Sequence, residues 1–478
     1  MEINATRFGF VGDARRLAEI LAVANRHKIT QGVTPEKVCA IFKDLGVAFI
    51  KIGQLLSLHP EVLPIEYCEA LKDLRTDAPS ISAAQIRDIV SDEFGRPWNT
   101  IFTRIKGIPE GSASIAQVHE AYLLDGTKVA VKVQRPDTYQ IMEQDTRLFK
   151  RALNVLKLTE LQDNLWMFNN VIDETWRVAQ QEMDFLKEAD NIERMAKIME
   201  PMAFATVPGV YHDLNTKNVL VMEFIDGIEL TDREGLIAAG YDMKEVVSKL
   251  IRSYIKQWAE DRFFQADPHP GNIRIRDGQI VWLDLGMTGE LTQKEADALH
   301  HCMHAILKND IDELIEWGMI LLDMEEYSGE TQMINDFKSI ASGLLDKYRV
   351  MTIRDMNGSE EVINDVFDVV KQFYINVPLD LNMYGRSLIV IEGTVSDLDD
   401  KINLVEILGT HLAAYAIGPG KAGEIARKLS HRRLCSGKPL KHADYQEIDI
   451  DPSDQELLSE EEYDLLLHSE KGDKVITD

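Results

Sequence analysis

A short segment rich in strand-forming residues, residues 98–134, stands between two long helical regions, and this order constrains the fold more than any other feature. The strand-like runs are residues 101–105, 117–123 and 129–133. An Asp125-Gly126 pair separates the last two, and such a pair between two strand-like runs predicts a β-hairpin. The sequence therefore predicts an α+β fold in which a small sheet joins largely helical regions.

Helical patterns flank this segment on both sides. Leu45, Phe49, Ile52 and Leu56 recur at helical spacing near the N-terminus. Further patterns predict helices over 81–94, 137–199 and 242–263, and strands over 205–211 and 218–225. We expect four domains: an N-terminal helical extension (1–97), a small lobe with a helical insert (98–225), a helical lobe (226–430) and an acidic, disordered tail (431–478).

The composition excludes some classes of function. The chain has 80 acidic and 52 basic residues, a net charge of −28, whereas nucleic-acid-binding proteins usually carry a basic patch. Its four cysteines form no CxxC pair, which indicates the reduced cytosol. The N-terminus lacks a signal-peptide pattern, and Glu406 interrupts the apolar stretch 404–417. We expect a cytoplasmic protein with at most peripheral contact with the inner face of a membrane.

Two features of the strand-rich segment suit the binding of nucleotide phosphates. A loop of mostly small residues includes Ala113, Ser114, Ile115 and Ala116, and the backbone N–H groups of such a loop can approach phosphates closely. Lys132 ends the run Val-Ala-Val-Lys in the next strand, where a lysine can neutralise the α- and β-phosphates. The alternative for Lys132 is an ordinary strand lysine whose stem packs on apolar neighbours.

Three polar residues further along the chain suit the chemistry of phosphoryl transfer. Asp267 and Asn272 are spaced as in a catalytic loop, where the aspartate positions the nucleophile and the asparagine holds a metal. Asp284 follows an apolar strand and precedes Leu-Gly, a position suited to holding Mg²⁺. Each motif alone occurs by chance, but their order and spacing together favour a nucleotide site.

Two further features lie between these motifs. The run 219–225 leads into Glu223 and Ile225, which we expect to form a hinge facing an adenine edge; a plain buried strand is the alternative. Glu188 is our candidate partner for Lys132, because a helix through 181–188 turns Glu182 away from it. Glu182 and Asp184 then face another partner, unless the three acids form a solvated face.

These motifs together resemble the UbiB (AarF) family of atypical kinase-like proteins over residues 40–410. The resemblance rests on five matches to its motifs: Lys51-Ile52-Gly53-Gln54 (KxGQ), the alanine-containing loop 112–119, Glu182-Met183-Asp184 (ExD), the loop 266–272 and Asp284-Leu285-Gly286. Ile391-Glu392-Gly393 and Leu398-Asp399 are similar to its C-terminal helical region. One departure is Gln265, which stands where the family often has histidine.

The resemblance implies a two-lobed protein-kinase-like fold with an N-terminal helical extension and a largely helical C-terminal lobe. In the family the extension lies over the substrate side of the active site, so Lys51 and Gln54 would close it, and Lys51 would meet Glu182 and Asp184. Asp267, Lys132 and Glu188 would be the catalytic residues, with Asn272 and Asp284 holding the metal. ATP and Mg²⁺ are the implied cofactors.

The implied function is that of an atypical kinase or ATPase that supports isoprenoid quinone (ubiquinone) biosynthesis. Its acceptor would be a small molecule, a lipid or a protein, and quinone-biosynthesis proteins would be partners. Two alternatives stay open. The chain is a nucleotide-binding pseudokinase that acts as a scaffold for biosynthetic partners, or it is a protein kinase.

Overall fold

The computed structural model describes residues 10–57, 63–72, 74, 81–113, 115–156, 165–308, 310–324, 331–349, 365, 369, 372–373, 377–399 and 421–443. These residues divide into two compact units. The first unit comprises residues 1–193, 208–225 and 285–287; the second comprises 194–207, 226–284 and 288–478. Both contain helices and strands, which confirms the predicted α+β class. The apolar stretch 404–417 and the candidate residue Ser114 lie outside the described residues.

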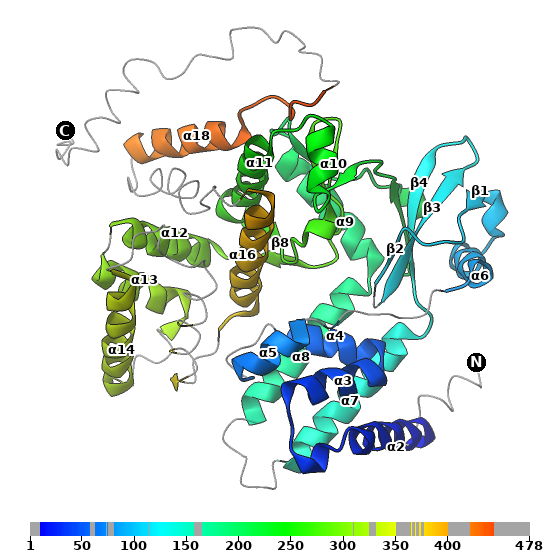
Figure 1. Cartoon of the computed structure of the whole chain (residues 1–478), viewed down its shortest axis with the longest axis horizontal. Coiled ribbons are helices and arrows are strands. Elements are labelled where there is room, and N and C mark those ends of the chain that lie inside the picture. Colours follow the sequence, from blue (N-terminus) through cyan, green and yellow to red (C-terminus); the bar gives the residue numbers. More distant parts are fainter. Residues whose placement is uncertain are drawn as a thin grey trace. The chain divides into compact units, whose positions relative to one another are not determined.

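A cluster of helices forms one part of the first unit (Figure 1). Its members are α2 (Phe10–Arg26), η1 (Ile29–Gln31), α3 (Pro35–Leu45), α4 (Val47–Leu56), α5 (Ile65–Lys72), α7 (Thr138–Leu156) and α8 (Leu165–Glu182). The predicted apolar positions Leu45, Phe49, Ile52 and Leu56 are all buried in its core. They belong to two helices, because Gly46 adopts φ 90° between α3 and α4, a conformation that favours glycine.

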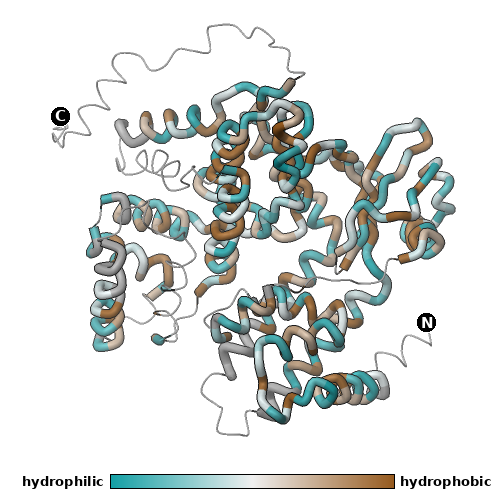
Figure 2. Tube along the Cα trace, in the orientation of Figure 1, coloured by the Kyte–Doolittle hydropathy of each residue, from teal (hydrophilic) through white to brown (hydrophobic). Residues whose placement is uncertain are grey.

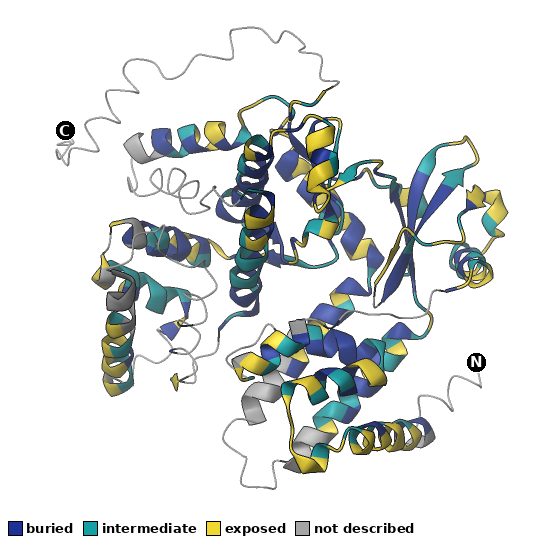
Figure 3. Ribbon diagram, in the orientation of Figure 1, coloured by how far each residue is buried: buried dark blue, intermediate teal, exposed yellow. Residues whose placement is uncertain are grey.

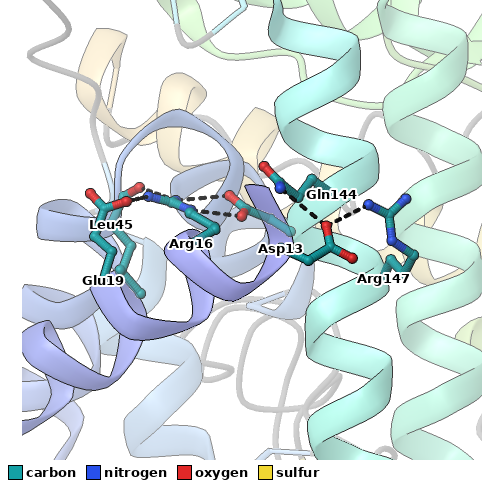
Figure 4. A network of polar contacts seen from close by, with 7 residues as sticks. Asp13, Arg16, Glu19, Leu45, Gln144 and Arg147 are labelled. Atoms are coloured by element: carbon teal, nitrogen blue, oxygen red, sulfur yellow. Dashed lines mark hydrogen bonds and ion pairs between the residues drawn. The ribbon is translucent and has the colours of Figure 1, made fainter. Parts of the chain in front are cut away.

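Charged side chains join α2 to α7 in this cluster (Figure 4). The Arg16 guanidinium donates to both carboxylate oxygens of Asp145, at 2.8 and 2.9 Å, and to the carbonyl oxygen of Leu45 at 2.7 Å. Asp13 accepts a hydrogen bond from Arg147 at 2.8 Å. The side chain of Asp145 is completely buried, so Arg16 compensates a charge that water cannot reach.

The rest of the first unit is built on an antiparallel sheet, in the order β1-β3-β4-β6 with β2 beside β3. Its elements are η2 (Trp98–Thr100), β1 (Phe102–Ile105), β2 (Gly111–Ser112), β3 (Ala116–Leu123), β4 (Lys128–Gln134), η4 (His212–Leu214) and β6 (Val219–Glu223). The predicted hairpin joins β3 to β4: Gly126 has φ 87°, and the Thr127 N–H donates to the Asp125 carboxylate at 2.9 Å. A capped helix, α6 (Ala83–Phe94), packs against this sheet (Figure 1).

Strand β4 presents different chemistry on its two faces. Val129, Val131 and Val133 are fully buried in the core that α6 shares with the sheet. Successive side chains alternate between the faces of a strand, so Lys132 lies on the opposite face. In Figure 2 the apolar residues of this hairpin appear brown, and in Figure 3 most of β3 and β4 is dark blue. The alternation thus gives one face to the apolar core and leaves the other for Lys132.

The second unit combines helices with two small sheets. One sheet has the order β5 (Ala205–Thr206), β10 (Gln279–Trp282), β9 (Ile273–Arg276) and β7 (Ile228–Glu229); the other pairs β8 (Phe263–Gln265) with β11 (Thr288–Glu290). The helices are α10 (Arg233–Ala238), α11 (Met243–Ile255), the π-helix η5 (Lys256–Glu260), η6 (Pro270–Asn272), α12 (Gln293–Lys308), α13 (Ile311–Leu321), α14 (Thr331–Arg349), α16 (Leu379–Leu398) and α18 (Lys421–Cys435). Helix α9 (Phe185–Met199) begins in the first unit and ends in the second.

The core of the second unit is formed around α11 and the π-helix. Trp258 is fully buried, and its ring lies 5.0 Å from that of Tyr384, which lies 5.8 Å from that of Phe264. Most of α11 is dark blue in Figure 3. The β9–β10 hairpin turns at Asp277 and Gly278, whose φ angles of 51° and 77° are typical of a type I′ turn.

Part of the predicted acidic tail is packed against the second unit. Residues 431–443 form the end of α18 and a segment in which Leu440 is fully buried. The Leu440 N–H donates to the Gly278 carbonyl at 2.6 Å, and the Ala443 N–H donates to the Ala239 carbonyl at 2.9 Å. Residues 444–478 lie outside the described residues. Among the helices that the structure describes, none is both long and apolar enough to span a bilayer.

Candidate functional site

A buried ion pair on the sheet of the first unit joins β4 to α9. Lys132 Nζ lies 2.6 and 2.8 Å from the two carboxylate oxygens of Glu188, and the residues are 8% and 1% exposed. The same amine lies 5.4 Å from the centre of the Phe185 ring. Gln134, next on this face of β4, donates to the carbonyl oxygen of Met183 at 3.0 Å. The structure therefore pairs Lys132 with the acid that the sequence analysis selected, although their catalytic role stays a prediction.

The helical argument behind that choice is wrong in one respect. The sequence analysis placed residues 181–188 on one helix, whereas α8 ends at Glu182 and α9 begins at Phe185. The Phe185 N–H leaves the helical ladder and donates to the carbonyl oxygen of Lys217 at 3.0 Å, while its side chain is fully buried. The break, and not a 100° rotation per residue, gives Glu182 and Glu188 different partners.

The second acid, Glu182, pairs with the lysine of the KxGQ motif. Lys51 Nζ lies 2.5 Å from Glu182 Oε1, and both side chains are buried. Among the described residues Lys51 makes no bond to Asp184, the other acid that the resemblance offered. Gln54 lies on the same helix, α4, but its amide donates to the carbonyl oxygen of Leu74 at 2.7 Å. The structure thus joins α4 to the end of α8 through Lys51 and anchors Gln54 to the backbone.

The glycine of the KxGQ motif allows a close approach of neighbouring side chains. A Cβ at Gly53 would lie 2.3 Å from Leu74 Cδ1 and 2.6 Å from Phe42 Cδ2, well inside van der Waals contact. A larger residue would force Leu74 and Phe42, or α4 itself, to shift. The spacing of apolar residues in the sequence did not predict that Gly53 lies against Leu74 and Phe42.

The small-residue loop is the turn that joins β2 to β3. The Ala113 N–H donates to the carbonyl oxygen of Ala116 at 2.9 Å. Arg135, which follows β4, donates from its backbone to Ile115 at 2.8 Å and from its side chain to the Ala113 carbonyl at 3.1 Å and the Ser112 hydroxyl at 2.9 Å. Arg135 therefore holds this turn, a role that the sequence analysis missed.

The predicted hinge residues lie at the end of β6. The Glu223 N–H donates to the Gly209 carbonyl at 2.7 Å, and the Gly209 N–H donates to the Glu223 carboxylate at 3.1 Å. Ile225 is buried. These bonds hold the end of β6 against residue 209, and the contact of Glu223 and Ile225 with an adenine stays a prediction.

In the second unit, Asn272 and Asp284 emerge at the same end of one hairpin. Ile273 pairs with Trp282 in the antiparallel β9–β10 ladder, so the residue before β9 and the residues after β10 are neighbours. The Leu283 N–H donates to the Asn272 carbonyl at 2.8 Å, and Asn272 Nδ2 donates to the Asp267 carbonyl at 3.3 Å. The hairpin thus brings the three predicted residues Asp267, Asn272 and Asp284 into one loop region, where Asp267 is exposed.

The donor set at this hairpin fits Mg²⁺. The amide nitrogen of Asn272 is bonded to the Asp267 carbonyl. The Asn272 amide oxygen and the Asp284 carboxylate stay the predicted ligands of the cation. Mg²⁺ prefers such oxygen ligands and keeps positions for water and phosphate, so one or two protein ligands suffice. In the part of the chain that is described, no group of three or more His, Cys, Asp or Glu side chains is placed to hold a metal.

Two amides that the sequence analysis did not single out as site residues hold the backbone at Asp284 and Leu285. Gln265 Nε2 donates to the carbonyl oxygen of Asp284 at 2.5 Å in the second unit. Asn191, on the part of α9 that belongs to the first unit, donates to the carbonyl oxygen of Leu285 at 3.0 Å. The sequence analysis noted Gln265 only as a departure from a family pattern, and nothing in the sequence pointed to Asn191.

Comparisons with known sequences match domain families over much of the chain. The ABC1 atypical kinase-like domain matches residues 73–317, and the UbiB helical domain matches residues 342–403. The first match covers Lys132, Glu188, Asp267, Asn272 and Asp284. It begins after the KxGQ motif, so Lys51 and Gln54 lie outside it.

Individual relatives agree with these matches. A Clostridium pasteurianum protein described as an uncharacterized protein in the hydrogenase 1 5′ region is 33% identical over 78% of this chain and 70% of its own length. The probable protein kinase UbiB of Azotobacter vinelandii is 29% identical over 76% of this chain and 67% of its own. The chloroplastic protein ACTIVITY OF BC1 COMPLEX KINASE 7 of Arabidopsis thaliana is 27% identical over 76% of this chain and 52% of its own. Together with the matched domains, these identities show that the chain belongs to the ABC1 (UbiB) family of atypical kinase-like proteins, as its motifs predicted.

Proposed function

We propose that this protein binds ATP with Mg²⁺ and transfers or hydrolyses the terminal phosphoryl group. The observation that carries the proposal is the Lys132–Glu188 pair: a buried amine held at 2.6 Å by a carboxylate, on the sheet face away from the apolar core. In kinases a strand lysine paired with a helix glutamate orients the α- and β-phosphates. Membership of an atypical kinase-like family supports the same chemistry.

Each proposed residue has a role that its position supports. Lys132 orients the phosphates, and Glu188 holds the amine in place. Asn272 and Asp284 hold Mg²⁺, which when bound offsets negative charge on the phosphoryl group. Asp267 orients the attacking hydroxyl or water, and its exposed position suits contact with an acceptor. The Ala113–Ala116 turn would cover the phosphates, and Glu223 and Ile225 would face the adenine.

The acceptor in this proposal is water, a small molecule or a lipid rather than a peptide. The buried Lys51–Glu182 bond fixes the extension helix α4 against α8, so this motif would close the substrate side of the site. Support of isoprenoid quinone biosynthesis, with proteins of that pathway as partners, is part of the proposal and rests on the family resemblance. The cytoplasmic location, with at most peripheral membrane contact, also stays a prediction.

Release of ADP from MgATP by the purified full chain tests the proposal. We expect Lys132→Met to lower turnover by about 100-fold or more, the range seen when one preorganised charge contact is removed. Lys128→Met is the matched control, because Lys128 lies on the same face of β4 but contacts Glu120 at 3.3 Å and the Phe224 ring at 3.9 Å. The mechanism is wrong if the Lys132 variant hydrolyses ATP like the parent.

Two further measurements separate the open alternatives. Nucleotide binding without turnover would favour the pseudokinase scaffold, and transfer of radiolabel to a general protein substrate would favour a protein kinase. A comparison of quinone intermediates in cells with and without the protein tests the pathway. Unchanged intermediates would contradict the quinone role without affecting the proposed site chemistry.

A further inference from the structure

We propose that Gln265 and Gln257 act as a pair of positioning residues, which set the backbone at Asp284 so that its carboxylate can hold Mg²⁺. This inference rests on the proposed function, because it assigns a role toward the same metal. All three residues belong to the second unit. Neither glutamine is proposed to touch nucleotide or metal.

Gln265 is the donor in two hydrogen bonds, one from its backbone and one from its side chain. The side-chain oxygen of Gln257 accepts the backbone N–H of Gln265 at 3.0 Å, and the side-chain nitrogen of Gln265 donates to the Asp284 carbonyl at 2.5 Å. Gln257 is fully buried and Gln265 is 1% exposed. Water therefore cannot replace either bond without opening the core.

The partners determine which way each amide points. A carbonyl oxygen only accepts hydrogen bonds, so the group of Gln265 that faces Asp284 must be the NH₂. A backbone N–H only donates, so the group of Gln257 that faces Gln265 must be the oxygen. A flipped amide at Gln265 would place two acceptors against each other, and a flipped amide at Gln257 would place two donors against each other. Each glutamine thus has one orientation that satisfies its neighbour.

The π-helix places Gln257 for this contact. The Asp261 N–H donates to the Lys256 carbonyl at 3.1 Å, five residues back, so one widened turn ends the helix. Arg262 then adopts φ 56°, and the chain enters β8, which ends at Gln265. π-turns of this kind occur often at functional sites. Here the widened turn and the reversal at Arg262 bring Gln257 back against a residue eight positions later.

Gln265 also pairs with Thr288, four residues after Asp284. Its backbone pairs with Thr288 in the β8–β11 ladder, while its side chain holds the Asp284 carbonyl. On the other side, the Leu283 N–H donates to the Asn272 carbonyl at 2.8 Å. Asp284 is therefore fixed before and after its Cα, which restricts the direction of its carboxylate relative to Asn272.

The test is the Mg²⁺ dependence of ADP binding, measured by titration calorimetry on the full chain. Removing a residue that orients a metal ligand typically costs 10- to 100-fold in metal affinity. We expect Gln265→Met to raise the Mg²⁺ concentration for half-maximal stimulation by about 10-fold, while ADP affinity without Mg²⁺ stays within about 2-fold. Gln257→Met should act in the same direction and less strongly, because it loosens Gln265 and leaves the bond to Asp284.

Gln279→Met is the matched control. Gln279 begins β10, at the end of the strand away from Asp284, and its amide also donates to a backbone carbonyl, that of Ala203 at 3.2 Å. We expect its Mg²⁺ requirement to equal that of the parent. An equal rise in all three variants, or an unchanged requirement in Gln265→Met, would overturn the inference.

Gln265→Glu gives a readout that a merely structural role would not produce. A protonated carboxyl can still donate to the Asp284 carbonyl, whereas the carboxylate cannot, and burial raises the pKa of a carboxyl. The Mg²⁺ requirement of this variant should be near that of the parent at about pH 6 and rise toward about pH 9, while the parent changes much less. A flat profile would contradict the inference even if Gln265→Met did not fold. If the parent itself binds no ADP with Mg²⁺, the proposed function is wrong. If the parent binds it but the variants behave like the parent, only the positioning role of the two glutamines is wrong.

Discussion

Lys51 Nζ lies 2.5 Å from Glu182 Oε1, although the two residues are 131 positions apart in the chain, and both are buried. The bond joins the KxGQ helix to the last residue of α8. A buried ion pair contributes little net stability, but removal of one partner leaves an uncompensated charge. The pair therefore specifies where α4 sits more than it stabilises the fold.

We expect Lys51→Met to lower the free energy of unfolding by about 3–5 kcal/mol, because the buried Glu182 carboxylate would lose its bond to Lys51. The double variant Lys51→Met/Glu182→Met should recover most of that loss, since no charge stays behind. Urea unfolding of both variants and of Glu182→Met alone completes the double-mutant cycle. Additive effects would show that the two side chains do not interact in solution.

Two arginines of α2 should differ strongly in their contribution to stability. Burial raises the pKa of the Asp145 carboxyl even beside Arg16, so Arg16→Met should cost about 3–5 kcal/mol at neutral pH. Arg26 pairs with Asp44 at 3.1 Å on the surface, and Arg26→Met should cost less than about 1 kcal/mol. The cost of Arg16→Met should shrink in acid, where Asp145 takes up a proton. Equal costs in urea unfolding would contradict the buried network of Figure 4.

Two glycine-to-alanine changes should have opposite effects. At Gly53 the new Cβ would meet Leu74 and Phe42, so we expect a loss of about 1–3 kcal/mol despite the better helix propensity of alanine. At Gly318, inside α13, no neighbouring atom lies within 4 Å of the new Cβ, and Gly318→Ala should gain about 0.5–1 kcal/mol. Thermal unfolding of both variants checks the pair. A stabilised Gly53→Ala would show that α4 is not closely packed.

The buried histidine of α12 should make stability depend on pH. Burial lowers the pKa of His300 from 6.5 to about 4, although the contact of its Nδ1 with the Ala296 carbonyl at 2.6 Å acts in the opposite direction. Its ring lies 5.7 Å from that of Trp258. Between pH 6.5 and 4, His300 is protonated in the unfolded chain but neutral in the folded chain. The free energy of unfolding is therefore unaffected above pH 6.5 and falls as the pH drops toward 4. The full penalty is about 3 kcal/mol. His300→Leu should remove this part of the slope in urea unfolding between pH 7 and pH 5, and an unchanged slope would contradict the burial.

Local chemistry in the sequence predicted several features correctly. The Asp125-Gly126 pair predicted the β3–β4 hairpin, because few residues other than glycine adopt φ 87° in a tight turn. The strand-like run 129–133 predicted β4, which spans Lys128–Gln134. The partner of Lys51, in contrast, came from the family resemblance, because no local pattern links residues so far apart.

Contacts distant in sequence decided the features that were missed. The break between α8 and α9 depends on the Lys217 carbonyl and on a buried pocket for Phe185, neither of which is visible in the local pattern. The strand predicted over 205–211 is paired only at Ala205–Thr206 and by a bridge at Val210, since Pro208 has no N–H for a ladder. The roles of Gln265 and Arg135 likewise depend on partners that folding brings to them.

The division of the chain described above affects how the protein can be cut. The backbone passes from one unit to the other after residues 193, 207, 225, 284 and 287. A fragment that starts at residue 226 lacks β5, the strand parallel to β10, and a fragment that ends at residue 225 lacks residues 285–287. No single break in the gene therefore yields either half intact, and domain shuffling would have to exchange both halves together.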